Sequence, residues 1–233
     1  MANTVTMMGY SVWQQSCRVL IQQIHDRLAV RQPFVHITTL NPEIMVRSEP
    51  DMAHWLKQSW VCVADDIGVC LLARRFGIRV PRLTGIDLAM QIIQRGVPVY
   101  CLGATVERIQ ATVDRCWELY PSATIVGYSS GYTVDDDWDS IVSVLNKQPT
   151  VILVGMGFPL QEQVIQRLAA EIPFGVAMGV GGMFDVVSGS CRRAPRWIQI
   201  VGLEWVYRAI REPVRLKRWR YLVSFLKFFI CQF

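Results

Sequence analysis

Two adjacent aspartates follow an apolar run in the first third of the chain. Asp65 and Asp66 come at the end of the segment 60–65 and precede Ile67 and Gly68. A carboxylate at the end of a strand is well placed as a general base, because it can take a proton from an attacking hydroxyl. Such a pair also suits the solvated start of a helix. Spacing alone leaves both interpretations open.

A second polar segment, Thr39-Leu40-Asn41-Pro42-Glu43, follows the apolar run 34–40. Asn41 and Pro42 are typical of a helix N-cap and the first helical position, and this interpretation is favoured by the residue types. A polar cap at the end of a strand also faces the crevice in which ligands bind. We therefore keep Thr39 and Asn41 as candidate contacts to a ligand.

Two glycine-rich segments also follow apolar runs. Gly155–Pro159 lacks the third glycine of a dinucleotide fingerprint and has a proline in its turn, so we expect no nicotinamide site there. Gly179–Gly182 offers backbone N–H groups of the kind that cradle phosphate. Three arginines follow within five residues, namely Arg192, Arg193 and Arg196. Although a solubility role is the alternative, the combination favours a phosphorylated ligand.

An acidic triplet, Asp135–Asp137, directly precedes Trp138. Acidic pairs hold metal ions in some sugar-nucleotide enzymes, but here the triplet stands at a predicted helix start, where acids complement the helix dipole. We favour the helix interpretation. The three histidines, His25, His36 and His54, lack the spacing of metal ligands. We therefore expect neither a metal nor a cofactor.

The elements that must position these residues alternate along the chain. The predicted strands are continuous in apolar character, as expected for strands covered on both faces. Strand–helix alternation predicts an α/β fold, a Rossmann-like parallel sheet with helices on both faces. Ligands of such sheets bind beyond the carboxyl ends of the strands. The predicted strands are 34–40, 60–65, 98–103, 123–128, 151–157 and 174–180, and the predicted helices are 106–120, 138–147 and 161–171.

The bulk composition fits one sizeable domain. Of the 233 residues, 52% are hydrophobic and 18% are charged, which excludes a disordered chain. The seven cysteines are scattered and form no CxxC pair, so we expect neither disulfides nor a zinc site. The first residues lack the pattern of a secretory signal, and no apolar run reaches the roughly 20 residues that span a bilayer. We expect a cytoplasmic protein.

The net charge of +5 is concentrated near the end of the chain. We predict a domain over 1–205 and a basic amphipathic helical appendage over 206–233, because basic and aromatic residues alternate there. Such a helix suits an anionic membrane surface and is too apolar for an arm that binds nucleic acid. Packing on the domain or on another subunit is the alternative. The basic residues are Arg208, Arg211, Arg215, Lys217, Arg218, Arg220 and Lys227.

Several short motifs, taken in order, resemble one known family. They run from about Val35 to Arg218, and together they are similar to the WecG/TagA/CpsF family, glycosyltransferase family twenty-six. The quoted motifs are Thr39–Glu43, Asp65–Gly68, Arg82–Leu88, Gly157–Pro159 with Gln161-Glu162, Gly179–Gly182 with Phe184-Asp185, Arg193–Pro195, Gly202–Trp205, Arg208, Glu212-Pro213, Arg215 and Arg218.

This resemblance implies an inverting, metal-independent transferase of bacterial cell-surface polysaccharide or teichoic acid synthesis. It implies a UDP-sugar donor, with N-acetylmannosamine or its uronic acid as first choice, and a polyprenyl-diphosphate-linked N-acetylglucosamine as acceptor. We expect the protein to be peripheral on the inner face of the cell membrane, and a homo-oligomer is allowed for. The alternatives are a glucosyl- or galactosyl-type transferase and a non-catalytic partner that enhances another transferase.

The resemblance also implies residue roles. Asp65 falls on the family's catalytic base, although Asp66 stands where the family usually has glycine and leaves the choice between the two carboxylates open. Leu160 and Thr133 also depart from the family pattern, which has a lysine and an aromatic there. Predicted with Asp65 in catalysis are Thr39 and Asn41; in donor binding Gly157, Gln161, Glu162, Gly179, Gly181, Gly182 and Asp185; and in phosphate or acceptor binding Arg82, Arg193, Arg208, Arg211, Arg215 and Arg218.

Overall fold

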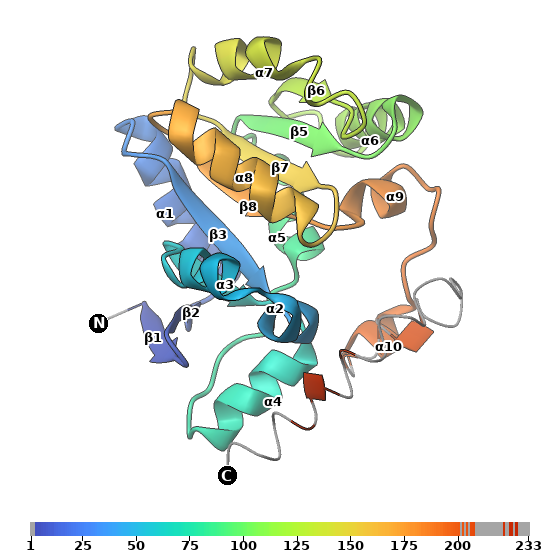
Figure 1. Cartoon of the computed structure of the whole chain (residues 1–233). Helices are drawn as coiled ribbons and strands as arrows, with labels where there is room; N and C mark the ends of the chain where they lie inside the picture. Colours follow the sequence, from blue (N-terminus) through green and yellow to red (C-terminus); the bar gives the residue numbers. More distant parts are fainter. Residues whose placement is uncertain are drawn as a thin grey trace.

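A sheet of eight mostly parallel strands organises the chain in the computed structural model (Figure 1). The structure describes residues 3–200, 202, 204, 206–207, 221, 224–225 and 227. The strand order is β1-β2-β4-β3-β8-β7-β5-β6. The strands are β1 Thr4–Met7, β2 Tyr10–Trp13, β3 Val35–Leu40, β4 Val61–Ala64, β5 Val99–Gly103, β6 Ile125–Ser129, β7 Val151–Gly155 and β8 Val176–Gly179.

Helices connect most of these strands and cover both faces of the sheet. The predicted α/β fold is confirmed, and the three predicted helices appear as α6, α7 and α8. The helices are α1 Cys17–Ala29, α2 Pro42–Arg47, α3 Pro50–Lys57, α4 Ile67–Arg75, α5 Gly85–Gln94, α6 Val106–Leu119, α7 Trp138–Leu145, α8 Leu160–Glu171, α9 Met183–Val187 and α10 Arg196–Ile200.

The sheet departs from a purely parallel one at one edge. β1 and β2 form an antiparallel hairpin around Met8 and Gly9, both at positive φ, and β2 joins the parallel strands through the pairing of Val12 with Cys62. Sequence reasoning missed this hairpin because each strand has only four residues and carries no continuous apolar run. The hairpin covers the edge of β4, which would otherwise present unpaired backbone groups.

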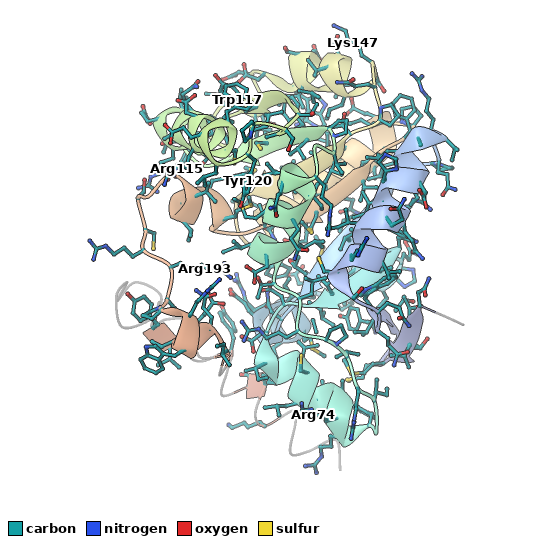
Figure 2. The ribbon with its side chains drawn as sticks, turned by 180° about the vertical axis from the view of Figure 1, so that it is seen from behind. Arg74, Arg115, Trp117, Tyr120, Lys147 and Arg193 are labelled. Atoms are coloured by element: carbon teal, nitrogen blue, oxygen red, sulfur yellow. The ribbon has the colours of Figure 1, made fainter. Side chains whose placement is uncertain are left out.

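Alternating strand residues divide the core between the two faces of the sheet. Val61 and Val63 of β4 pack with α1, α5 and α6, whereas Cys62 and Ala64 pack with α2, α3 and α4. Further along the sheet, Tyr100 and its neighbours on the second face pack under α7 and α8. Figure 2 shows α1, α5 and α6 from behind, and α8 lies in front of the sheet in Figure 1. Cover on both faces explains why the strands are continuously apolar.

The strand order brings four polar or glycine-rich strand ends together. β4, β3, β8 and β7 are parallel neighbours in this order, so their carboxyl ends lie at one edge of the sheet. Asp65 follows β4, Asn41 follows β3, Gly179 ends β8 and Gly155 ends β7. The chain therefore brings segments that are far apart in sequence to one edge of the sheet, the edge at which ligands of such folds bind.

The described side chains near the end of the chain contact the domain. Phe225 is 3% exposed and belongs to the core cluster beneath α4. The Arg47 guanidinium lies 4.8 Å from the ring centroid of Tyr221. The boundary at residue 205 stays a prediction. The predicted phosphate or acceptor contacts Arg208, Arg211, Arg215 and Arg218 lie outside the described residues.

Within the described ranges, no helix combines the length and the apolar character needed to cross a membrane.

The close approach of β5 and β7 predicts a glycine requirement. Gly103 has a φ of +141°, and a Cβ there would lie 2.7 Å from the carbonyl carbon of Gly155 and overlap its oxygen. We expect Gly103→Ala to lower the free energy of unfolding by about 4 kcal/mol, because backbone must move. Gly77, with a φ of +72° and no atom within 4 Å of an added Cβ, is the control. Gly77→Ala should cost about 1 kcal/mol. Equal losses of unfolding free energy in Gly103→Ala and Gly77→Ala, measured by urea denaturation, would contradict the close approach of β5 and β7.

Candidate active site

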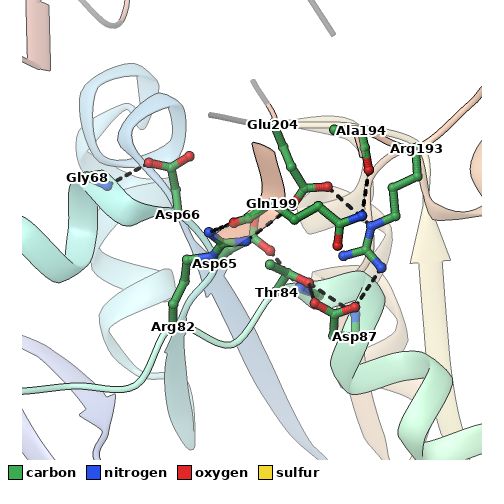
Figure 3. A network of polar contacts seen from close by, with 11 residues as sticks. Asp65, Asp66, Gly68, Arg82, Thr84, Asp87, Arg193, Ala194, Gln199 and Glu204 are labelled. Carbon is green, nitrogen blue, oxygen red and sulfur yellow. Dashed lines mark hydrogen bonds and ion pairs between the residues drawn. The ribbon is translucent and has the colours of Figure 1, made fainter. Parts of the chain in front are cut away.

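The two adjacent aspartates serve different helices. Asp66 is the N-cap of α4, where its Oδ1 accepts a hydrogen bond from the Gly68 N–H at 2.7 Å. Asp65 Oδ1 accepts the N–H of Gly85, the first residue of α5, at 2.6 Å (Figure 3). Burial raises the pKa of Asp66, against the effect of the Gly68 N–H and the Arg82 guanidinium. Asp66 therefore caps its own helix, α4, whereas Asp65 contacts the start of α5.

Gly85 marks the point at which the strand ends meet. A Cβ added there would lie 3.1 Å from Thr39 Cγ2, 3.5 Å from the Gly179 carbonyl oxygen and 3.7 Å from Asp65 Oδ1. Thr39, itself buried, donates its hydroxyl to the Gly179 carbonyl at 3.0 Å. The structure therefore brings Asp65, Thr39 and Gly179 together around Gly85, and the roles predicted for these residues stay predictions.

Asn41 has the capping role that its residue type favoured. Its Oδ1 accepts the Ile44 N–H at 3.0 Å at the start of α2, and Pro42 is the first helical residue. The Asn41 side-chain amide also lies 3.5 Å from the Thr39 carbonyl oxygen. The cap prediction is confirmed, and the role in catalysis stays a prediction.

The two glycine segments are joined through the start of α8. Gln161 Oε1 accepts the Gly181 N–H at 3.1 Å, and Gln161 Nε2 donates to Glu162 Oε1 at 2.8 Å. A side chain at Gly179 would press on this amide, because its Cβ would lie 2.8 Å from Gln161 Cδ. Gln161 and Glu162 are both 4% exposed. Gly157, at a φ of +75°, has open space where a side chain would stand, so backbone is exposed there to a ligand.

Two predicted phosphate-binding arginines belong to a network beside Asp65 (Figure 3). Arg82 donates to the Gln199 carbonyl and pairs with Glu204 at 3.3 Å. Arg193 pairs with Glu204 at 3.2 Å and with Asp87 at 2.7 Å. Burial is the largest single effect and acts to raise the pKa of Asp87, but the contacts with Arg193 and Thr84 and the charge of Arg82 together outweigh it and lower the pKa. Both arginines are thus held in place by protein carboxylates.

Asp185, a predicted donor contact, takes part in an ion pair outside the glycine segments. Its carboxylate lies 2.7 Å from Arg108 Nη1 of α6 and so joins α9 to α6. Gly182 occupies the N-cap position of the same short helix. The ion pair gives Asp185 a structural role. Its part in donor binding stays a prediction.

The acidic triplet begins a helix, as its position favoured. Asp137 is the N-cap residue of α7 and accepts the Thr133 hydroxyl at 2.6 Å. Asp135 pairs with Arg167 of α8 at 2.7 Å. Across the part of the chain that the structure describes, no group of three His, Cys, Asp or Glu side chains is arranged to hold a metal ion.

Sequence reasoning gave no role to Thr84, Gly85, Asp87 or Glu204. Thr84 caps α5 by accepting the Asp87 N–H at 3.1 Å, and it donates its hydroxyl to Asp87 Oδ2 at 2.7 Å. The spacing of a threonine three residues before an acid resembles a capping box and was available as a signal. The bridging role of Glu204 had no local signal, because its partners lie 122 and 11 residues away in sequence.

The sequence that forms this α/β fold matches the model of one family of transferases. The family model described as "Glycosyl transferase WecG/TagA/CpsF family" matches residues 5–233, so the chain belongs to this family. The resemblance seen in the motifs is therefore confirmed.

Three curated relatives carry the name N-acetylglucosaminyldiphosphoundecaprenol N-acetyl-beta-D-mannosaminyltransferase. The protein from Bacillus subtilis (strain 168) is 33% identical over 189 residues, which cover 78% of this chain and 73% of the relative. That from Bacillus spizizenii (strain ATCC 23059 / NRRL B-14472 / W23) is 33% identical over 199 residues, 82% of this chain and 76% of the relative. That from Staphylococcus aureus (strain MW2) is 30% identical over 197 residues, 82% of this chain and 77% of the relative.

The role of Asp66 as the N-cap of α4 predicts that its replacement lowers stability. We expect Asp66→Ala to lower the free energy of unfolding by about 1 kcal/mol, because the cap of α4 is lost. Asp66→Asn is the matched control, since asparagine caps helices about as well as aspartate. Urea denaturation of both variants measures the difference. Equal destabilisation by alanine and asparagine would argue against the cap.

Proposed function

We propose that this chain is a hexosyltransferase that moves N-acetylmannosamine, or its uronic acid, from a UDP-linked donor onto N-acetylglucosamine carried by undecaprenyl diphosphate. Support comes from the names of three relatives that are 30% to 33% identical over most of the chain. The observation that carries the proposal is the convergence of Asp65, Thr39 and the Gly179 carbonyl around Gly85. It places a carboxylate suited to general-base catalysis beside the second glycine segment.

The proposed reaction is a single displacement. Asp65 takes the proton of the acceptor hydroxyl while that oxygen forms a bond to the anomeric carbon of the donor sugar. The bond from this carbon to UDP breaks on the opposite face, so the anomeric configuration is inverted. The hydrogen bond from the Gly85 N–H holds the Asp65 carboxylate in place at the end of β4.

Two parts of the site are suited to the donor diphosphate. Gly181 donates its N–H to Gln161, so it contributes open backbone space rather than that N–H, and a side chain there would meet no atom within 4 Å. Arg193 Nη2 is buried and has no hydrogen-bond partner among the described atoms. A phosphate oxygen would satisfy this donor and offset the charge that develops on departing UDP.

The remaining arginines of the prediction are assigned to the acceptor. Arg208, Arg211, Arg215 and Arg218 follow Glu204 in the chain, and Glu204 bridges Arg82 and Arg193 of the network. We propose that these four cations meet the diphosphate of the lipid-linked acceptor. Cations of this kind neutralise a diphosphate by charge-assisted hydrogen bonds.

The catalytic assignment predicts a large loss of turnover in Asp65→Asn. We expect the rate of transfer at saturation to fall by about 10²- to 10⁴-fold, because the amide cannot accept the proton. The assay supplies UDP-N-acetylmannosamine and a short-chain polyprenyl-diphosphate acceptor, and it contains EDTA because we propose that no metal takes part. UDP-glucose as competing donor tests the sugar.

Asp66→Asn is the control for this experiment, since it keeps the cap and changes the neighbouring carboxylate. Near-normal turnover of Asp65→Asn, or an equal loss in Asp66→Asn, would remove Asp65 as the base. A wild-type chain that binds UDP without transferring any of these sugars would favour the alternative of a non-catalytic partner.

We further propose that segment 206–233 holds the protein on the anionic inner face of the cell membrane. Each basic residue near such a surface contributes about 1 kcal/mol, so binding to phosphatidylglycerol vesicles should weaken stepwise as cations are neutralised. Co-sedimentation with phosphatidylcholine vesicles measures the part that does not depend on charge. The variant changes Arg215, Lys217, Arg218 and Arg220 to Gln, and the control changes the exposed Arg18, Arg31, Arg95 and Lys147 to Gln. Equal vesicle binding by the two variants would reject the membrane role.

A further inference from the structure

A buried carboxyl group lies behind the second glycine segment. Glu162 is in the first turn of α8, is 4% exposed and accepts a hydrogen bond from Gln161 Nε2 on its Oε1 at 2.8 Å. Its other oxygen, Oε2, is buried and has no hydrogen-bond partner among the described atoms. An unpaired oxygen in such a place is far less costly on a neutral acid than on a carboxylate.

The groups that face Glu162 do not supply a compensating cation. Gly179 of β8 has no side chain, and a Cβ added there would lie 3.2 Å from Glu162 Oε1. Glu43 of α2 acts on Glu162 through its negative charge and is itself paired with Arg47 of the same helix. No ion pair to Glu162 is found in the described part of the chain. Burial raises the pKa of Glu162 to about 7, and Glu43 adds to this against the Gln161 hydrogen bond.

A short chain of hydrogen bonds leads from Glu162 to the glycine segment. The Gln161 amide donates to Glu162 and accepts the Gly181 N–H at 3.1 Å. The amide can satisfy both partners in only one orientation, because a flipped amide would point its NH2 group at the Gly181 N–H. A change in the charge of Glu162 is therefore transmitted to Gly181 through the side chain of Gln161.

We propose that Glu162 is a positioning residue that works as a neutral acid, holding the Gln161 amide against Gly181 and keeping negative charge out of the wall of the donor pocket. This inference rests on the proposed function, which places a UDP diphosphate at Gly179–Gly182. Ionisation of Glu162 puts a negative charge two hydrogen bonds behind the loop. The affinity for an anionic donor then falls as the pH rises through the titration of this group.

Calorimetric titration with UDP tests the proposal on the full chain and on Glu162→Gln. The amide variant keeps an acceptor oxygen for Gln161 and is neutral at every pH. We expect similar UDP affinities at about pH 5.5 and about tenfold tighter binding by Glu162→Gln at about pH 8.5. The terminal phosphate of UDP titrates near pH 6 in both experiments, so the affinity ratio at each pH is the quantity compared.

Glu162→Ala separates positioning from simple packing. It removes the acceptor for Gln161 and leaves the amide without its partner, so we expect weaker UDP binding at all pH values, whereas Glu162→Gln should restore binding. The melting temperature supplies a readout without ligand. The raised pKa contributes stability that is fully present below about pH 4.5 and is lost as the pH rises through about 7. The melting temperature of Glu162→Gln should therefore rise relative to that of the wild type between these two pH values.

Two results would overturn the proposal. The first is a UDP affinity ratio between Glu162→Gln and the wild type that stays constant from acid to alkaline pH. The second is a Glu162→Gln variant that binds UDP as poorly as Glu162→Ala. Either leaves the proposed function standing, because UDP still binds to the wild type. Folded protein that binds no UDP at any pH would instead overturn both the proposed function and this inference.

Discussion

The pairing of β3 with β8 brings the proposed site together, and one side-chain hydrogen bond extends this pairing to the ends of the strands. Thr39 of β3 donates to the Gly179 carbonyl of β8 across 140 residues of sequence. The bond ties the first strand of the predicted alternation to the last at their carboxyl ends, where β4 delivers Asp65. Space for the contact depends on glycine, because a Cβ on Gly85 would crowd Thr39 and one on Gly179 would strike Gln161. Glycines at these positions thus allow the polar side chains to approach the strand ends closely.

Three of the polar residues near these strand ends have a structural role as helix caps. Asn41, Asp66 and Thr84 cap α2, α4 and α5 and so satisfy backbone N–H groups that would lack partners. Asp65 receives an N–H from the start of α5 without being the cap of its own helix, and Glu162 is buried with one oxygen unpaired. We propose chemistry for Asp65, which contacts the start of α5, and positioning for Glu162, whose Oε2 has no hydrogen-bond partner among the described atoms.

The arginine network connects the start of α5 to Glu204, in the later part of the chain. Glu204 holds Arg82 and Arg193 together, and Asp87 holds Arg193 to the first turn of α5. Since α5 also supplies the Gly85 N–H to Asp65, one helix start links the proposed base to the arginines. Movement of the segment that carries Glu204 would therefore change the position of the arginines relative to Asp65.

Local patterns in the sequence predicted much of this molecule. Continuous apolar runs indicated β3 to β8, because strands covered on both faces need no polar residues, and Asn41-Pro42 indicated a cap. The sequence alone could not divide the roles of Asp65 and Asp66, because their partners Gly85 and Gly68 are set by how α5 and α4 approach β4. Nor could it place Glu162 behind Gly181, since burial and distant hydrogen bonds exist only once the strands are ordered. Periodicity and capping are short-range and readable along the chain, whereas convergence of strand ends, and the electrostatics that follow from it, belong to the tertiary structure.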